Sequence, residues 1–214
     1  RSHGRVSVFA RAARRGGSSL PATLQPFAEL LVSWNARGEA GQLTGAERVR
    51  APATLAGDRL MGAFYANELL IKLLHRHDPH PVLFDAYGTL IARLHDSAQS
   101  AARALRLFEK RLLDELGWGL SLDAEAPSGR ALEPARSYRY RLDGGPEPLD
   151  GVAEGSLVFS GASLLSLARD ELDDERSLAD ARRLLRAALE QCLDGRPLRT
   201  REVLIAMRAH GGGT

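Results

Sequence analysis

Five arginines gather at the start of the chain, where nothing opposes their charge. They are Arg1, Arg5, Arg11, Arg14 and Arg15, and no acidic residue precedes Glu29. Uncompensated guanidinium groups on a strand and its following glycine-rich loop produce a local positive field that suits phosphate backbones. The cluster therefore indicates either a nucleic-acid interface or an ordinary solvated loop, and the residues alone leave both interpretations open.

The distribution of charge along the chain also places the excess of positive charge at the N-terminal end. The 214 residues carry a formal net charge of +2, but residues 1–50 hold eight Arg and three Glu, whereas the remainder holds 21 basic and 24 acidic residues. Arg37, beside Gly38 in a predicted turn, belongs to the basic part. The basic character of the chain therefore belongs to its N-terminal end.

Aromatic side chains that stack on unpaired bases are few in this basic part. They are Phe9, Phe27 and Trp34. An aromatic residue on an alternating strand belongs to the core more often than to a binding platform, so Phe9 and Phe27 are predicted to be buried. Trp34 stands at a strand end, where either role suits it.

A second basic group falls on a helix predicted over residues 97–116. Arg103, Arg106 and Lys110 have i, i+3, i+7 spacing and form one stripe beside a Leu/Phe face. A solvated helix face explains this stripe. So does a groove that accepts a short peptide with acidic residues and a hydrophobic carboxyl end.

Three histidines raise the question of catalysis. His75, His77 and His80 lie in the segment HRHDPH, and imidazoles ligate zinc and nickel, although a polar connector between two helices is needed there anyway. The sequence has no Walker loop, no Gly-x-Ser-x-Gly and no His-Glu-x-x-His motif. We therefore expect no enzyme, no cofactor and no metal. The alternative is a metal-dependent hydrolase or small-molecule-binding enzyme that uses these histidines.

Hydrophobic periodicity predicts the elements that position these groups. A period of two over residues 5–11, a longer apolar stretch over 27–34 and the segment 41–51 after a Gly-rich turn predict short strands. A helical period follows from about residue 52. The predicted helices lie around residues 60–74, 81–94, 97–116, 161–171, 177–193 and 200–208. Residues 119–156 are predicted to be loop-rich, with a possible strand pair around 137–142, and residues 209–214 to be a disordered tail.

Other features concern the compartment. No apolar run approaches eighteen residues and the first seventeen residues lack a signal-peptide pattern, so neither a membrane span nor a leader is expected. A single cysteine, Cys192, excludes an intrachain disulfide and favours a reducing cytoplasm. Strand-like alternation is under way by residue 5, which indicates that an N-terminal segment precedes Arg1.

The assembled pieces resemble the bacterial RecO recombination mediator family, and the resemblance covers nearly the whole chain. The order and spacing of several short stretches carry it. They are His3-Gly4-Arg5-Val6, Ala10-Arg11, Ala13-Arg14, Leu24-Gln25-Pro26-Phe27, Tyr65-Ala66-Asn67-Glu68-Leu69-Leu70, Leu83-Phe84, Tyr87, Leu105-Arg106, Phe108-Glu109, Leu112-Leu113, Leu116-Gly117-Trp118, Leu198-Arg199 and Arg201-Glu202.

The resemblance implies an α+β multidomain protein. Its first domain, residues 1–54, would be an OB-fold, a small β-barrel that lacks its first strand here, and residues 55–214 would form an all-α domain with the loop-rich insertion. The implied function is a non-enzymatic mediator of DNA repair and homologous recombination in the RecF pathway, cytoplasmic and nucleoid-associated. Such a mediator binds single- and double-stranded DNA, anneals complementary strands, works with RecR and helps RecA load where single-strand binding protein covers the DNA.

The resemblance also assigns roles to residues. Arg5, Arg11 and Arg14 fall on the strand and loop that are similar to the family's DNA-contacting surface. We add Arg15, Trp34 and Arg37 to the predicted DNA-binding set.

A peptide site is implied on the third predicted helix. Arg106 falls beside the groove that accepts the acidic, Phe-ended tail of single-strand binding protein, with Leu105 and Phe108 as wall residues. Arg103 and Lys110 are our extension of that site.

One departure from the family concerns zinc. Many relatives carry a four-cysteine zinc module in the region that corresponds to residues 119–140, and this chain has no cysteine there. Zinc is therefore not expected, and the insertion is predicted to be held by packing alone.

Overall fold

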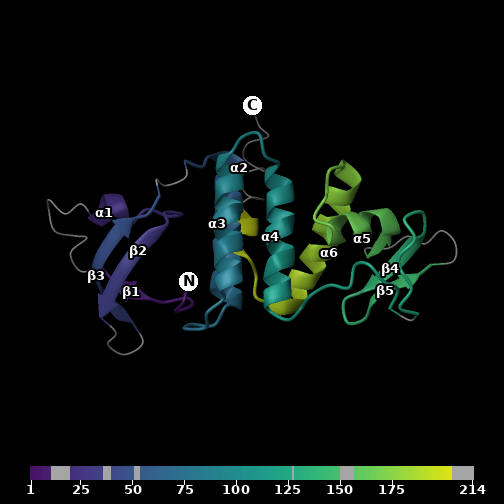
Figure 1. The fold of residues 1–214 in the computed structure, drawn as a ribbon, viewed down its shortest axis with the longest axis horizontal. Coiled ribbons are helices and arrows are strands. Elements are labelled where there is room, and N and C mark those ends of the chain that lie inside the picture. The colour runs from purple at the N-terminus through teal and green to yellow at the C-terminus, as the bar shows by residue number, and fades with distance from the viewer. Residues whose placement is uncertain (11–19, 36–39, 51–53, 127, 150–156, 204–214) are drawn as a thin grey trace. The chain divides into compact units, whose positions relative to one another are not determined.

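The computed structural model describes residues 1–10, 20–35, 40–50, 54–126, 128–149 and 157–203. They form a mixed α/β fold with two three-stranded sheets and several helices (Figure 1). Contacts divide the chain into one compact unit of Arg1–Gln99 with Leu198–Thr214 and another of Ser100–Pro197. The domain boundary near residue 54 stays a prediction. No helix in the described ranges is long and apolar enough to cross a membrane.

The sheet of the first unit is built from β1 (Val8–Phe9), β2 (Leu30–Asn35) and β3 (Gly41–Arg48). Their order is β1-β3-β2, with β1 parallel and β2 antiparallel to β3. Along β2 the side chains alternate between half-buried and exposed, because successive residues of a strand point to opposite faces of the sheet. Within the described residues the sheet is open and forms no closed barrel. A single helical turn, α1 (Leu20–Thr23), precedes β2.

The first unit also contains two long helices, α2 (Gly57–Leu73) and α3 (Pro81–His95). Small side chains on α2, such as Ala63 and Ala66, are fully buried, as is Leu94 on α3. Small residues at a helix contact let two helices pack closely. Pro81 begins α3, as predicted, because a proline at the first helical position sacrifices no hydrogen bond.

The end of α3 is held by one arginine of α2. The Arg59 guanidinium donates to five backbone carbonyl oxygens at 2.8–3.3 Å, those of Arg93, Leu94, Asp96, Ser97 and Gln99. Carbonyls in the last turn of a helix have no partner within the helix. Arg59 therefore satisfies groups that water would otherwise have to solvate.

The second unit contains α4 (Ala101–Glu115), α5 (Gly161–Ala168) and α6 (Glu175–Leu193). Side-chain caps fix where they begin: the Ser100 hydroxyl accepts from the Arg103 N–H at the start of α4. The predicted start of α6 at Ser177 is wrong, because the Asp174 carboxylate accepts from the Ser177 N–H at 2.8 Å and the helix begins at Glu175.

The insertion after α4 is more ordered than predicted. It contains β4 (Ser137–Arg141) and β5 (Gly145–Pro148), which pair with each other. β4 also pairs with β6 (Val158–Ser160), so the strand order is β5-β4-β6 and both pairings are antiparallel. The predicted strand pair is therefore confirmed. Tyr138 is fully buried, and its hydroxyl oxygen accepts from the Glu133 N–H at 2.9 Å.

The prediction that packing alone holds this insertion is wrong. The carboxylate of Glu125 is buried, accepts from the Ser128 hydroxyl at 2.6 Å and pairs with Arg136 at 3.5 Å. A buried carboxylate is stable only when it is paired and hydrogen-bonded. The loop therefore owes its shape to a polar cluster as well as to apolar contacts.

Candidate nucleic-acid interface

Four of the six predicted DNA-binding residues lie outside the described residues. They are Arg11, Arg14, Arg15 and Arg37. Arg5 and Trp34 are described, and both make contacts within the protein. The predicted DNA-binding set thus stays a prediction, and its two described members have structural roles.

Arg5 ties the N-terminal segment to the end of α2. Its guanidinium donates to the carbonyl oxygen of Leu74 from Nε at 3.3 Å and from Nη2 at 3.1 Å. The Arg5 carbonyl accepts from the His77 N–H at 3.1 Å. A cation at a helix C-terminus satisfies an unpaired carbonyl and interacts favourably with the helix dipole. Arg5 therefore anchors the strand that leads into the basic loop.

Gly4 allows this close approach. Its φ is +64°, in the left-handed region, and a Cβ there would lie 2.3 Å from the Asp78 carbonyl oxygen. Only glycine fits such a contact without displacement. The N-terminal segment is therefore seated directly on the backbone of the α2–α3 connection.

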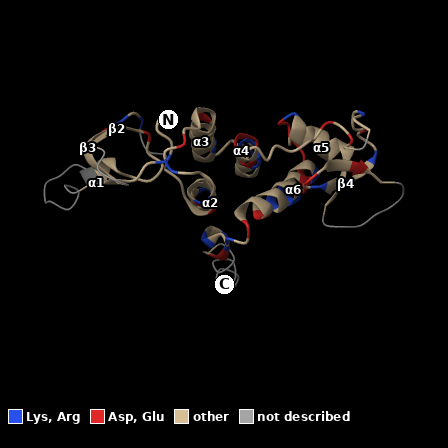
Figure 2. Cartoon of the chain, turned by 90° about the horizontal axis from the view of Figure 1, so that it is seen from below, with Lys and Arg blue, Asp and Glu red and all other residues tan. Residues whose placement is uncertain are grey.

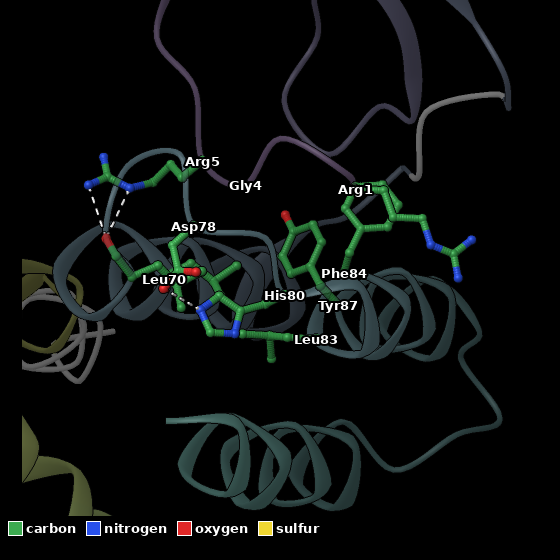
Figure 3. Close-up of a pocket in the computed structure, with 10 residues that line it drawn as sticks. Arg1, Gly4, Arg5, Leu70, Asp78, His80, Leu83, Phe84 and Tyr87 are labelled. Carbon is green, nitrogen blue, oxygen red and sulfur yellow. Dashed lines mark hydrogen bonds and ion pairs between the residues drawn. The ribbon is translucent and has the colours of Figure 1, made fainter. Parts of the chain in front are cut away.

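A cavity of about 160 Å³ lies where this segment meets the two helices (Figure 3). Aliphatic side chains of α2 and the aromatic rings of α3 line it, and polar groups stand at its rim. The lining residues are Arg1, Gly4, Arg5, Leu70, Leu74, Asp78, His80, Leu83, Phe84 and Tyr87. Burial raises the pKa of Tyr87 to about 12 although its hydroxyl donates to Asn67 Oδ1 at 2.6 Å, so the phenol stays neutral.

The three histidines of the alternative interpretation do not form a metal site. His80 Nε2 lies 3.3 Å from Asp78 Oδ2, while His75 and His77 are exposed. Among the described residues, no group of three His, Cys, Asp or Glu side chains is arranged to hold a metal ion. A polar connector between α2 and α3 accounts for these residues, and the metal-dependent hydrolase has no support.

Trp34 is half-buried on the inner face of the first sheet. Its ring meets His3 edge-on with centroids 5.0 Å apart. A Cβ at Gly41 would lie 2.5 Å from Trp34 Cδ1, so the indole occupies the space that this glycine leaves. The indole is therefore a packing residue of the sheet in this structure.

Phe9 contradicts its prediction. Its side chain is 65% exposed, whereas Phe27 is half-buried and meets Phe64 of α2 edge-on at 5.1 Å. Alternation along a strand establishes that Val8 and Phe9 face opposite sides of the sheet. It does not establish which side faces the core, and here Val8 takes the half-buried position.

The predicted peptide site on α4 is occupied by contacts within the second unit. Lys110 Nζ donates to the carbonyls of Leu167 and Ala168 at 2.9 and 2.8 Å and to Asp170 Oδ1 at 2.6 Å. The Arg103 guanidinium donates to the carbonyls of the same turn, at Asp170 and Glu171. Basic and acidic residues are interspersed along α4 and α6 (Figure 2). Lys110 therefore caps the end of α5, and Arg103 holds the turn that follows it.

The remaining predicted residues of that site are also packed inside. Arg106 pairs with Glu109 at 2.6 Å, and both side chains are largely buried. Phe108 is 2% exposed and belongs to the core, and Leu105 is half-buried. The helix face predicted as a groove rim is thus mainly an internal surface of the second unit.

Formal charge differs sharply between the units. The first unit contains 15 of the 29 basic residues and 9 of the 27 acidic ones, and the second contains the other 14 and 18. The formal net charge is therefore +6 in the first unit and −4 in the second, with histidine neutral. The sequence asymmetry found over residues 1–50 therefore extends to the whole first unit.

Comparison with known proteins gives the family. Residues 1–52 match the family described as Recombination protein O N terminal, and residues 55–202 match Recombination protein O C terminal. The chain belongs to the RecO family. A DNA repair protein RecO from Methylococcus capsulatus is 42% identical over 201 residues, which are 94% of this chain and 81% of the relative.

Two further RecO relatives are similar. The DNA repair protein RecO of Alkalilimnicola ehrlichii is 44% identical over 94% of this chain and 79% of its own length, and that of Aromatoleum aromaticum is 39% identical over 95% and 84%. These RecO proteins are named for DNA repair and not for a catalysed reaction. The resemblance read from the sequence is confirmed.

Proposed function

We propose that this RecO-family chain is a non-enzymatic mediator that binds single- and double-stranded DNA through its first unit. The observation that supports the proposal most directly is the positive charge of that unit in a chain of a DNA-repair family. Binding would release counterions from the phosphates, so affinity would fall steeply with salt. In this proposal the open sheet of β1, β2 and β3 is part of an OB-fold, and the protein acts in the cytoplasm at the nucleoid.

Strand annealing follows from the same charge. Repulsion between two phosphate backbones is a main barrier to their approach, and a surface that neutralises both lowers it. The proposed mechanism needs no acid, base or nucleophile. It needs cations near the N-terminal sheet, and the predicted ones are Arg11, Arg14, Arg15 and Arg37.

The partners are proposed from the family resemblance. With RecR, the protein would help RecA load on DNA covered by single-strand binding protein, whose acidic tail would dock on the second unit. Because Lys110 caps α5 and Arg103 holds the turn after it, their substitution would disturb the unit itself. Arg111, which is exposed on the same helix, is the informative position for a tail-peptide binding test.

The first experiment is fluorescence anisotropy of a labelled single-stranded oligonucleotide over a range of salt concentrations. We expect tight binding at low salt and a steep linear decrease of log K with log salt. Absence of binding at low salt would overturn the proposed function.

A further inference from the structure

Three exposed side chains form a row across the first sheet. Phe9 on β1 pairs with Gln42 on β3, and Gln42 pairs with Asn35 on β2. Residues directly opposite one another on neighbouring strands project to the same face. Phe9 is 65% exposed, and both amide residues are exposed as well. We call these three residues the Phe9 row.

We infer that the Phe9 row binds one unpaired nucleobase of single-stranded DNA, an inference that rests on the proposed function. The Phe9 ring supplies a face on which a base stacks. The Gln42 and Asn35 amides each offer a hydrogen-bond donor and an acceptor to the base edge. Within the described residues neither amide side chain has a hydrogen-bond partner, so both are available.

The dimensions of the row suit a single base. Strands in a sheet lie about 4.8 Å apart, so the row of three spans about 10 Å. A stacked base would therefore reach from the Phe9 ring toward the amides of its neighbours. No backbone group of the sheet has to be unpaired for this contact.

Charge near the row favours a nucleic acid over an apolar protein partner. The row itself carries no charge. In the sequence Arg11 follows Phe9 by two residues and Arg37 follows Asn35 by two, and Glu39 is the one acidic residue between Asn35 and Gln42. Uncharged stacking residues flanked by cations are the arrangement that single-strand binding uses. The acidic residue of this face, Glu47, pairs with Leu31 farther along the sheet. The phosphates are therefore expected near the Phe9 row and not near the Leu31–Glu47 pair.

Phe9→Leu tests the stacking directly, because leucine keeps an apolar side chain but removes the aromatic face. We expect its affinity for a single-stranded oligonucleotide to be roughly 10- to 100-fold weaker, with Phe9→Trp close to wild type. The slope of log K against log salt is expected to stay the same, because no phosphate contact is lost. Affinity for a duplex, whose bases are already stacked, is expected to be unchanged.

Leu31→Ala is the matched control. Leu31 lies on the same sheet face and is also 65% exposed, but it is outside the row. Wild-type affinity in this variant supports the inference, and an equal loss would overturn it. If the wild type binds single strands and Phe9→Leu binds them equally well, the inference is wrong while the proposed function stands. If the wild type binds no DNA, the proposed function itself fails.

Sedimentation of the wild type and of Phe9→Leu distinguishes base binding from self-association of the protein through this face of the sheet. An unchanged molar mass, together with the loss of affinity, supports base binding. A wild-type self-association that disappears in the variant would identify the face as a protein interface and overturn the inference.

Discussion

The Glu68 carboxylate holds Thr200 in place through two hydrogen bonds. It accepts from the Thr200 backbone N–H at 2.9 Å and from its hydroxyl at 2.8 Å, and it also accepts from the Arg199 N–H at 2.8 Å. Residues 199–203 are helical, so Glu68 caps the start of that helix from α2, 131 residues earlier. Glu68 therefore helps to fix the returning chain to the first unit, together with the buried side chain of Leu198.

Glu68→Gln should destabilise the protein by about 1–2 kcal/mol at pH 7, because hydrogen bonds to a charged acceptor are stronger than those to an amide. Burial opposes ionisation, but the hydrogen bonds from Thr200 and Arg199, with Lys72 nearby, outweigh it and hold the pKa of Glu68 below its ordinary 4.5. The stabilisation is present above about pH 4.5 and is lost as pH falls through the lowered pKa. Urea unfolding of both proteins at pH 7 and below pH 4 measures this.

Glu47→Gln serves as the control for that experiment. Glu47 is exposed on β3, and the same charge is removed without a cap. The two substitutions should differ at pH 7 and converge in acid. Equal effects at pH 7 would show that net charge, and not the helix cap, accounts for the loss.

Gly4→Ala should lower the free energy of unfolding by at least ~2 kcal/mol. Alanine would be strained at the left-handed φ of residue 4, and its Cβ would clash with the backbone of Asp78. Gly88→Ala is the matched substitution, because Gly88 lies in α3 with open space around its Cα and should gain about 0.5–1 kcal/mol in helix propensity. Thermal unfolding of the two variants should therefore shift in opposite directions. A tolerated alanine at residue 4 would contradict the seating of the N-terminal segment.

Arg106→Met should destabilise the second unit by about 3–5 kcal/mol, because it leaves the Glu109 carboxylate, whose side chain is 2% exposed, without its arginine. Adding Glu109→Met should recover most of the loss, since two apolar side chains replace a desolvated ion pair. Chemical denaturation of the single and double variants gives both values. A double variant as unstable as Arg106→Met would show that the loss does not come from the charge left on Glu109, and would contradict the prediction.

Arg11→Glu combined with Arg14→Glu should weaken DNA binding and reduce the salt slope by roughly 2, or about one per lost phosphate contact. The control makes the same charge change in the second unit, at the exposed residues Arg111 and Arg182. Anisotropy titrations at several salt concentrations compare them. Equal losses in both variants would indicate a response to overall charge and not to the N-terminal loop.

The sequence predicted those parts of the fold that depend on local periodicity. The helices from Pro81 and Ala101 and the strand at residues 137–141 lie close to their predicted positions, because apolar spacing and caps act within a few residues. Local periodicity could not predict the partners of the basic side chains on α4. Lys110 meets Asp170 sixty residues later, and only the tertiary fold brings such groups together.

The candidate site shows the same limit. Alternation correctly separated Val8 from Phe9, but it could not assign the exposed face, and the exposed aromatic proved to be the one predicted for the core. The Phe9 row depends on strand register, which pairs residues of three separate segments. The one sequence feature that could have indicated this row is the presence of uncharged amide residues, Asn35 and Gln42, near the facing ends of two predicted strands.

The carbonyls around Arg59 carry a consequence for how this part of the chain can change over time. Every amino acid presents the same backbone oxygen, so the hydrogen bonds from Arg59 place no demand of their own on the side chains at the five positions, although core packing still constrains Leu94. A substitution at residues 93–99 leaves the contact intact as long as the turn keeps its course. The side-chain requirement of this particular contact therefore falls on one position, that of Arg59.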